Sequence, residues 1–141
     1  MIAGRSFLDT NILVYAFDPK AKSKREYAQL RVARAEATGD AVISFQVVQE
    51  FLSLALRKFP RPMTQPEAQA YLSQVPMPLC EVFPDASLYS SALSIADETG
   101  WTFYDSLIVG AAVAAQCTVL LTEDLQHGRT VRGVEIRNPF L

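Results

Sequence analysis

Short apolar segments alternate with longer segments of helical pattern along this chain, and that alternation constrains the fold more than any other feature. The apolar segments are bounded by polar, glycine or proline residues, as buried strands commonly are. The expected strands cover residues 5–8, 41–44, 79–83, 118–121 and 134–136. Strands that alternate with helices are joined by right-handed crossovers, which build a parallel sheet with helices on both faces. The pattern therefore predicts an α/β fold.

The segments between these strands carry helix signals. A helix is expected over residues 22–38, where Gly39 would end it, and another over residues 45–59, which Pro60 follows. Thr64 and Glu67 form a capping box for a helix that reaches about residue 75, where Pro76 and Pro78 would break it. Further helices are expected over residues 12–17, 85–98 and 106–116.

The spacing of apolar residues also predicts which sides of these helices are buried. The inward side of the helix over residues 22–38 is expected to carry Tyr27, Leu30, Ala33 and Ala37. In the helix over residues 45–59, Gln46 is expected on the polar side and Glu50 at its border with the apolar side. The helix over residues 106–116 is apolar on nearly every side, so it should be buried on several sides.

Length and composition fit a folded globular protein. The 141 residues suit one domain, expected over residues 1–141; half of them are apolar and a fifth are charged. No apolar segment approaches the roughly 18 residues of a membrane span, and no secretion signal opens the chain. The expected location is therefore the cytoplasm, without membrane contact. Cys80 and Cys117 lack metal-ligand spacing and are expected to be buried thiols.

Charge is distributed unevenly along the chain. The formal net charge of −2 does not by itself indicate a nucleic-acid-binding protein. No lysine or arginine occurs between Pro62 and Gly128, whereas several acidic residues do. Ten of the thirteen basic residues lie in the first 61 positions, so we expect the protein to present both a basic and an acidic surface.

Four acidic residues occupy corresponding places beside the predicted sheet. Asp9 and Asp124 each follow a predicted strand. Glu50 lies in the second turn of the helix after the second strand, and Asp105 opens the most apolar helix. In a parallel sheet these positions share one edge, where a crevice opens if the first and fourth strands are neighbours. Taken singly, each acid could be a helix cap or an exposed helix residue, and only their shared edge favours a joint role.

A divalent cation would suit such a cluster. Clustered carboxylates repel one another and are costly to bury without compensation. Mg²⁺ and Mn²⁺ prefer oxygen ligands, and Mg²⁺ usually keeps several waters. A metal held in this way can polarise a phosphate and activate a water for attack. The four acids are therefore candidate metal ligands and catalytic residues. His127, the only histidine, is expected to be structural or at the surface.

Four short segments surround these acids: Phe7-Leu8-Asp9-Thr10-Asn11, Ser44 followed by Gln49-Glu50-Phe51, Tyr104-Asp105-Ser106-Leu107-Ile108, and Leu121-Thr122-Glu123-Asp124. Their order and spacing resemble the PIN-domain ribonucleases across nearly the whole chain. The length and the ending Arg137-Asn138-Pro139-Phe140 resemble in particular the VapC toxins of bacterial and archaeal toxin–antitoxin pairs.

The resemblance implies a three-layer α/β/α sandwich around a mainly parallel sheet. It also implies an endoribonuclease that uses Mg²⁺ or Mn²⁺ to hydrolyse RNA phosphodiester bonds, forms a homodimer and is neutralised by a cognate antitoxin protein. The implied acidic core is Asp9, Glu50 and Asp105, with Asp124 as the fourth acid and Asn11 and Thr122 as polar supports. The family gives no firm expectation for Glu123. Candidates for contact with RNA are Lys20, Lys22, Lys24, Arg25, Arg57, Lys58 and Arg61.

Two other functions stay open at this point. A phosphoacceptor or phosphatase-like domain would use an aspartate after the first strand. The phosphatase form expects a second aspartate where this chain has Asn11, and the receiver form expects a late lysine, whereas no lysine follows Lys58. A catalytically silent PIN-like module that binds RNA or protein would keep the fold without the chemistry, and a lack of metal binding would favour it.

Overall fold

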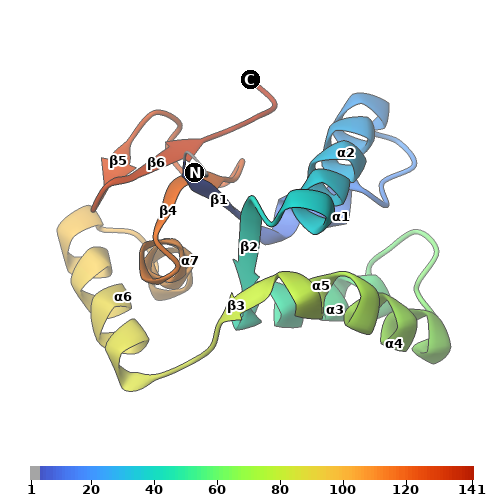
Figure 1. Ribbon diagram of the computed structural model, residues 1–141, viewed down its shortest axis with the longest axis horizontal. Helices are drawn as coiled ribbons and strands as arrows, with labels where there is room; N and C mark the ends of the chain where they lie inside the picture. Colours follow the sequence, from blue (N-terminus) through green and yellow to red (C-terminus); the bar gives the residue numbers. More distant parts are fainter. Residues whose placement is uncertain (1–3) are drawn as a thin grey trace.

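The computed structural model describes residues 4–141 and places one six-stranded sheet between two layers of helices (Figure 1). The strands are β1 (Arg5–Leu8), β2 (Ala41–Ser44), β3 (Cys80–Val82), β4 (Cys117–Leu121), β5 (Thr130–Val131) and β6 (Val134–Arg137). Their order across the sheet is β3-β2-β1-β4-β6-β5. Neighbouring strands pair in parallel, except that the short β5 is antiparallel to β6. The predicted α/β fold with a mainly parallel sheet is confirmed.

The helices form two groups, one on each face of the sheet. They are α1 (Thr10–Tyr15), α2 (Lys22–Thr38), α3 (Phe45–Arg57), α4 (Gln65–Gln74), α5 (Pro76–Leu79), α6 (Ala86–Thr99) and α7 (Phe103–Ala114). The chain steps outward from β1 to β3 and then returns to β4 on the other side of β1, so right-handed crossovers send α6 and α7 to the opposite face from α1–α5 (Figure 1). Within residues 4–141, no helix has the length and apolar composition to cross a membrane.

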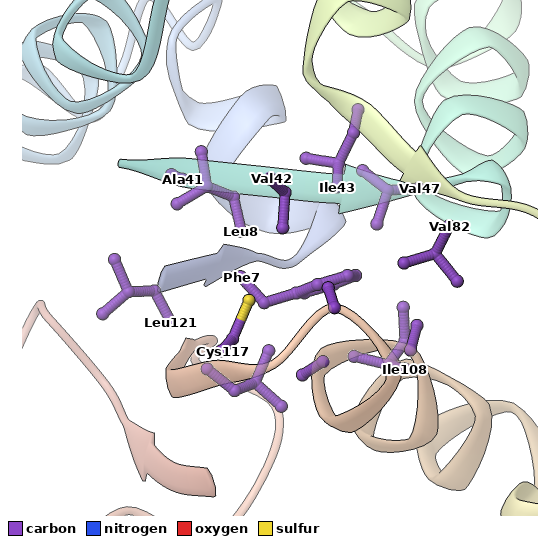
Figure 2. Packing of buried hydrophobic residues seen from close by; sticks show 14 of the residues in the cluster. Phe7, Leu8, Ala41, Val42, Ile43, Val47, Val82, Ile108, Cys117 and Leu121 are labelled. Atoms are coloured by element: carbon purple, nitrogen blue, oxygen red, sulfur yellow. The ribbon is translucent and has the colours of Figure 1, made fainter. Parts of the chain in front are cut away.

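The core is built around the two central strands. Phe7 and Leu8 of β1 and Leu120 of β4 are fully buried, because these strands have a neighbour on each side and helices above and below. Figure 2 shows Phe7 between the β2 side chains and Ile108 of α7. Cys80 and Cys117 are both buried and unbridged, as expected. Burial raises the pKa of the Cys117 thiol to about 11, which keeps it protonated at neutral pH.

Several helix ends follow the sequence signals closely. The hydroxyl of Thr64 accepts a hydrogen bond from the Glu67 N–H, and the Glu67 carboxylate accepts one from the Thr64 N–H. Gly39 and Gly100 end α2 and α6 in the left-handed conformation, with φ of 71° and 76°, where glycine carries no Cβ penalty.

The starts of two helices differ from expectation. Helix α7 begins at Phe103 rather than at residue 106, because the Thr102 hydroxyl accepts a hydrogen bond from the Asp105 N–H and caps the helix. Asp105 therefore lies inside the first turn of α7. Helix α1 begins at Thr10 rather than at residue 12, because Asp9 caps it directly.

Four further differences concern the end of α3 and three short elements. Helix α3 ends at Arg57 rather than at residue 59. Pro76 opens the single turn α5 where a break was expected, since proline fits the first turn of a helix. The strand expected over residues 79–83 is limited to Cys80–Val82, and the two-residue β5 carries too short a pattern to be found in the sequence.

The predicted inward side of α2 is wrong. The buried residues are Ala28, Val32 and Ala35, whereas Leu30 is 74% exposed. Small apolar residues occur all round this helix, so its sequence does not single out one side, and packing against the neighbouring elements selects it.

Candidate metal centre

The site begins where β1 and β4 leave the sheet side by side. Leu8 lies opposite Leu121 in the parallel register, and the Asp9 N–H donates to the Leu121 carbonyl at 3.0 Å. Asp9, the residue after β1, and Thr122, the residue after β4, therefore lie side by side. Because β2 lies on the other side of β1, the helices that follow β1 and those that precede β4 cover opposite faces of the sheet, and this is the position at which open α/β sheets form their crevices.

Asp9 is an almost completely buried carboxylate, with 7% of its surface exposed. Its Oδ1 accepts a hydrogen bond from the Thr10 N–H and its Oδ2 accepts one from the Thr122 hydroxyl, both at 2.7 Å. Burial raises the pKa of Asp9 from 3.8 to about 6, because the loss of hydration outweighs these two hydrogen bonds. The nearby Asp124 and Glu50 carboxylates add repulsion that raises this pKa further. Asp9 is thus a site where a nearby positive charge would be stabilising.

The two residues after Asp9 each hold another acid. The Thr10 hydroxyl donates to Oε1 of Glu50 at 2.7 Å. The Asn11 amide donates through Nδ2 to Oδ2 of Asp124 at 3.1 Å. Glu50 and Asp124 are otherwise exposed, so these contacts direct their side chains toward the turn that carries Asp9.

Thr122 forms hydrogen bonds with two of the acidic residues through one hydroxyl. Its hydroxyl donates to Asp9 and also accepts a hydrogen bond from the Asp124 N–H at 3.1 Å. It is fully buried, so its hydroxyl has a fixed environment. Asn11 and Thr122, which the sequence marks as polar supports, both hydrogen-bond to the predicted acids.

Asp105 is held differently from the other three acids. It is partly exposed in the first turn of α7, and within residues 4–141 its carboxylate has no hydrogen-bond donor. The Tyr104 carbonyl just before it accepts a hydrogen bond from Nε2 of Gln46 at 3.2 Å. The position of the Asp105 carboxylate therefore depends on the contacts of the backbone in the first turn of α7.

All four acids line one open cleft of about 370 Å³. The residues around it are Asp9, Thr10, Asn11, Val14, Tyr15, Gln46, Glu50, Leu54, Tyr104, Asp105, Ile108 and Asp124. Across the described part of the chain, no three His, Cys, Asp or Glu side chains already stand close enough to share one metal ion. Mg²⁺ needs no such cage, because it usually binds one or two carboxylates and keeps several waters. The all-oxygen donor set and the buried Asp9 carboxylate therefore fit Mg²⁺ or Mn²⁺.

Glu123 lies outside the cleft lining, although it is next to Asp124. Its carboxylate accepts hydrogen bonds from the Tyr15 hydroxyl and from Nζ of Lys24, the latter at 3.0 Å. Partial burial acts to raise the pKa of Glu123, but these two hydrogen bonds outweigh it and hold that pKa below its usual value. The Lys24 ammonium also lies 4.7 Å from the centre of the Tyr15 ring. Asp124 is thus the acid of this pair that faces the cleft.

His127 is exposed and also lies outside the cleft lining. Its Nδ1 accepts a hydrogen bond from the Asn138 N–H at 2.9 Å, which ties the C-terminal segment to the loop after β4. This contact agrees with the structural or surface role expected of it.

Sequence reasoning missed two cleft residues. Thr10 carries no predicted role of its own, and Gln46 is expected on the polar side of its helix, whereas it is 5% exposed. The position of Gln46, four residues before Glu50, was the available signal, because residues so spaced share one side of a helix.

The sequence matches the PIN domain family over residues 6–132. This match covers most of the chain, and the protein belongs to the PIN domain family. A search of curated protein sequences gives no significant match.

Solved structures with the same fold include several toxins. A toxin–antitoxin complex from Klebsiella pneumoniae superposes with a TM-score of 0.65 at 18% identity, covering 92% of this chain and 94% of the other. DNA-bound VapBC from Salmonella typhimurium gives 0.60 at 20% identity, covering 94% and 96%. VapC20 from Mycobacterium tuberculosis, described as a Sarcin-Ricin loop cleaving toxin, gives 0.58 at 18% identity, covering 84% and 91%. At these identities the likeness concerns the fold.

The buried Asp9 carboxylate predicts an unusual pH dependence in chelator-treated protein. Between pH 3.8 and about 6, the folded protein binds a proton at Asp9 more tightly than the unfolded chain does. The contribution of Asp9 to the free energy of unfolding therefore falls as pH rises through this window, by at most about 3 kcal/mol. Helix capping alone would predict that Asp9→Asn leaves stability nearly unchanged. Burial predicts instead that Asp9→Asn is more stable than wild type at pH 7.5 and gains little at pH 4.

Urea unfolding of both proteins in EDTA at the two pH values measures this effect. Other carboxylates titrate in the same range, but they are common to both proteins and cancel in the difference. Equal stability of the two proteins at pH 7.5 would contradict the account.

Proposed function

We propose that this chain is a metal-dependent endoribonuclease of the VapC toxin type. The observation that carries the proposal is the gathering of four carboxylates, from four separate parts of the chain, around one cleft. Membership of the PIN domain family supports it. The toxin–antitoxin complexes among the structures of like fold, and the Sarcin-Ricin loop cleaving toxin VapC20, support the toxin assignment.

The cleft residues would have distinct roles in catalysis. Asp9, Glu50 and Asp105 would hold the cation, with Asp124 as the fourth acid. A bound Mg²⁺ or Mn²⁺ would supply polarisation of the scissile phosphate and activation of a water. Thr122 and Asn11 orient Asp9 and Asp124 through their hydrogen bonds. Glu50 is exposed and accepts a hydrogen bond from the neutral Thr10 hydroxyl, so it would be available to accept a proton.

Substitution of the acids tests this assignment. Asp9→Asn and Asp105→Asn each remove one negative charge while preserving size, and we expect Mn²⁺-dependent RNA cleavage to fall at least about 100-fold, within the range typical of groups that stabilise charge in a transition state. The matched control is Asp97→Asn, an exposed acid of α6 that lies outside the cleft. Cleavage of a labelled RNA pool, with and without EDTA, is the measurement.

The outcomes separate the candidate functions. Undiminished cleavage by both cleft variants would remove the nuclease assignment. A wild-type protein that neither binds Mn²⁺ nor cleaves RNA would favour the catalytically silent module.

RNA would also need positive charge beside the acidic cleft. A second hollow of about 330 Å³ adjoins the cleft, and the two share Val14 and Leu54 in their linings. Lys20 and Lys58 line this hollow. Two other predicted RNA contacts have structural partners, because Lys24 pairs with Glu123 and Arg25 donates to the Asp18 carbonyl. Lys20 and Lys58 are therefore the best-placed candidates to contact the phosphates next to the scissile one.

Salt dependence of RNA binding tests this path. In an Asp105→Asn background, which prevents cleavage, Lys58→Ala should weaken binding of single-stranded RNA and lower the slope of log affinity against log salt by about 0.7. The control Lys22→Ala removes an exposed lysine at the start of α2, outside both hollows. A slope in Lys58→Ala equal to that of the Asp105→Asn protein alone would exclude Lys58 from the RNA path.

A homodimer and a cognate antitoxin complete the proposal. The toxin–antitoxin complexes among the structures of like fold support the antitoxin. Exposed apolar side chains of α6 and α7, including Tyr89, Leu93 and Phe103, offer a surface for a second copy. Light scattering should give about twice the chain mass of 15.6 kDa. A mass of one chain at micromolar concentration would remove the dimer.

A further inference from the structure

Gln46 is a cleft residue that the four acids and their supports do not account for. It is the second residue of α3 and is 5% exposed, so it lies in the wall of the cleft rather than at its rim. Glu50 follows four residues later on the same side of this helix. Any contact that fixes Gln46 therefore also fixes the helix surface from which Glu50 extends.

The hydrogen bond of Gln46 acts on the peptide group that precedes Asp105. Nε2 of Gln46 donates to the Tyr104 carbonyl, and the Thr102 hydroxyl accepts from the Asp105 N–H, both at 3.2 Å. This carbonyl and this N–H belong to one planar peptide group, which is therefore held at both edges. In the described part of the chain no hydrogen-bond donor contacts the Asp105 carboxylate. The position of this peptide group therefore determines where the carboxylate lies.

Stability does not explain why an amide occupies this position. The Gln46 Nε2 must face the Tyr104 carbonyl, because a carbonyl only accepts, and this orientation is therefore set. The opposite atom, Oε1, is buried and has no hydrogen-bond partner within residues 4–141. A buried unpaired acceptor costs free energy that an apolar side chain of similar size avoids. The Tyr104 carbonyl lies within α7, whose own hydrogen-bond ladder would still satisfy it without Gln46.

We propose that Gln46 is a positioning residue of the acidic site. It ties α3, which carries Glu50, to the first turn of α7, which carries Asp105, and so sets the separation of these two carboxylates. The inference rests on the proposed metal-dependent function, and it concerns the geometry that a cation would meet. Because the Gln46 amide is uncharged, it positions Glu50 and Asp105 without neutralising their negative charge.

Isothermal titration calorimetry of purified protein with Mn²⁺ tests this role without measuring cleavage. Gln46→Met removes the amide at similar volume and should weaken Mn²⁺ binding by roughly 10–100-fold, as loss of a group that orients a metal ligand typically does. Its melting temperature in EDTA should equal or exceed that of wild type. The matched control Gln49→Met changes an exposed residue of the same helix and should bind Mn²⁺ as wild type does.

The outcomes are distinguishable. Wild-type Mn²⁺ affinity in Gln46→Met would overturn the positioning role and leave the proposed function intact. A lower melting temperature together with lost affinity would also overturn it, because Gln46 would then be needed for folding. An absence of Mn²⁺ binding in wild type, with RNA cleavage that resists EDTA, would overturn both the proposed function and this inference.

Discussion

The parallel pairing of β1 with β4 is the interaction on which the site depends. It sets Asp9 beside Thr122 and buries a carboxylate that accepts hydrogen bonds from the Thr10 N–H and the Thr122 hydroxyl. In the strand order β2-β1-β4, connections on opposite faces of the sheet also meet at this point, and α1, α3, α7 and the loop after β4 all begin at one edge. Four acids that are distant in sequence become neighbours for this reason.

The acids of the cleft are positioned by neutral donors. Hydroxyl, amide and backbone N–H groups donate to Asp9, Glu50 and Asp124. At the peptide group before Asp105, Gln46 donates to the carbonyl and the Thr102 hydroxyl accepts from the N–H. In residues 4–141 the ion pairs involve other acids, including Glu123, which pairs with Lys24. Neutral donors fix geometry without cancelling charge, so the cleft keeps the negative potential that would attract a divalent cation.

Local sequence patterns predicted most strands and helices, but they could not predict contacts between residues far apart in the chain. Strand β2, helix α2 and the Thr64 capping box follow from patterns within a few residues, and the acids could be placed because strand ends share an edge. The start of α7 was missed because the capping role of Thr102 was not recognised. The buried side of α2 and the Gln46–Tyr104 hydrogen bond, which spans 58 residues, depend on how the elements pack. The partners of Glu123 depend on the same packing, so local pattern alone did not separate Glu123 from Asp124, and only the family resemblance favoured Asp124.

The central claim is that the cleft is a metal centre. Anomalous diffraction from crystals grown with Mn²⁺ locates the cation directly, independently of any activity measurement. The account predicts a strong anomalous peak in the cleft, within ligand distance of Asp9 and at least one of Asp105 and Asp124. Saturating Mn²⁺ with no peak in the cleft, or with peaks only at other acids, would contradict it.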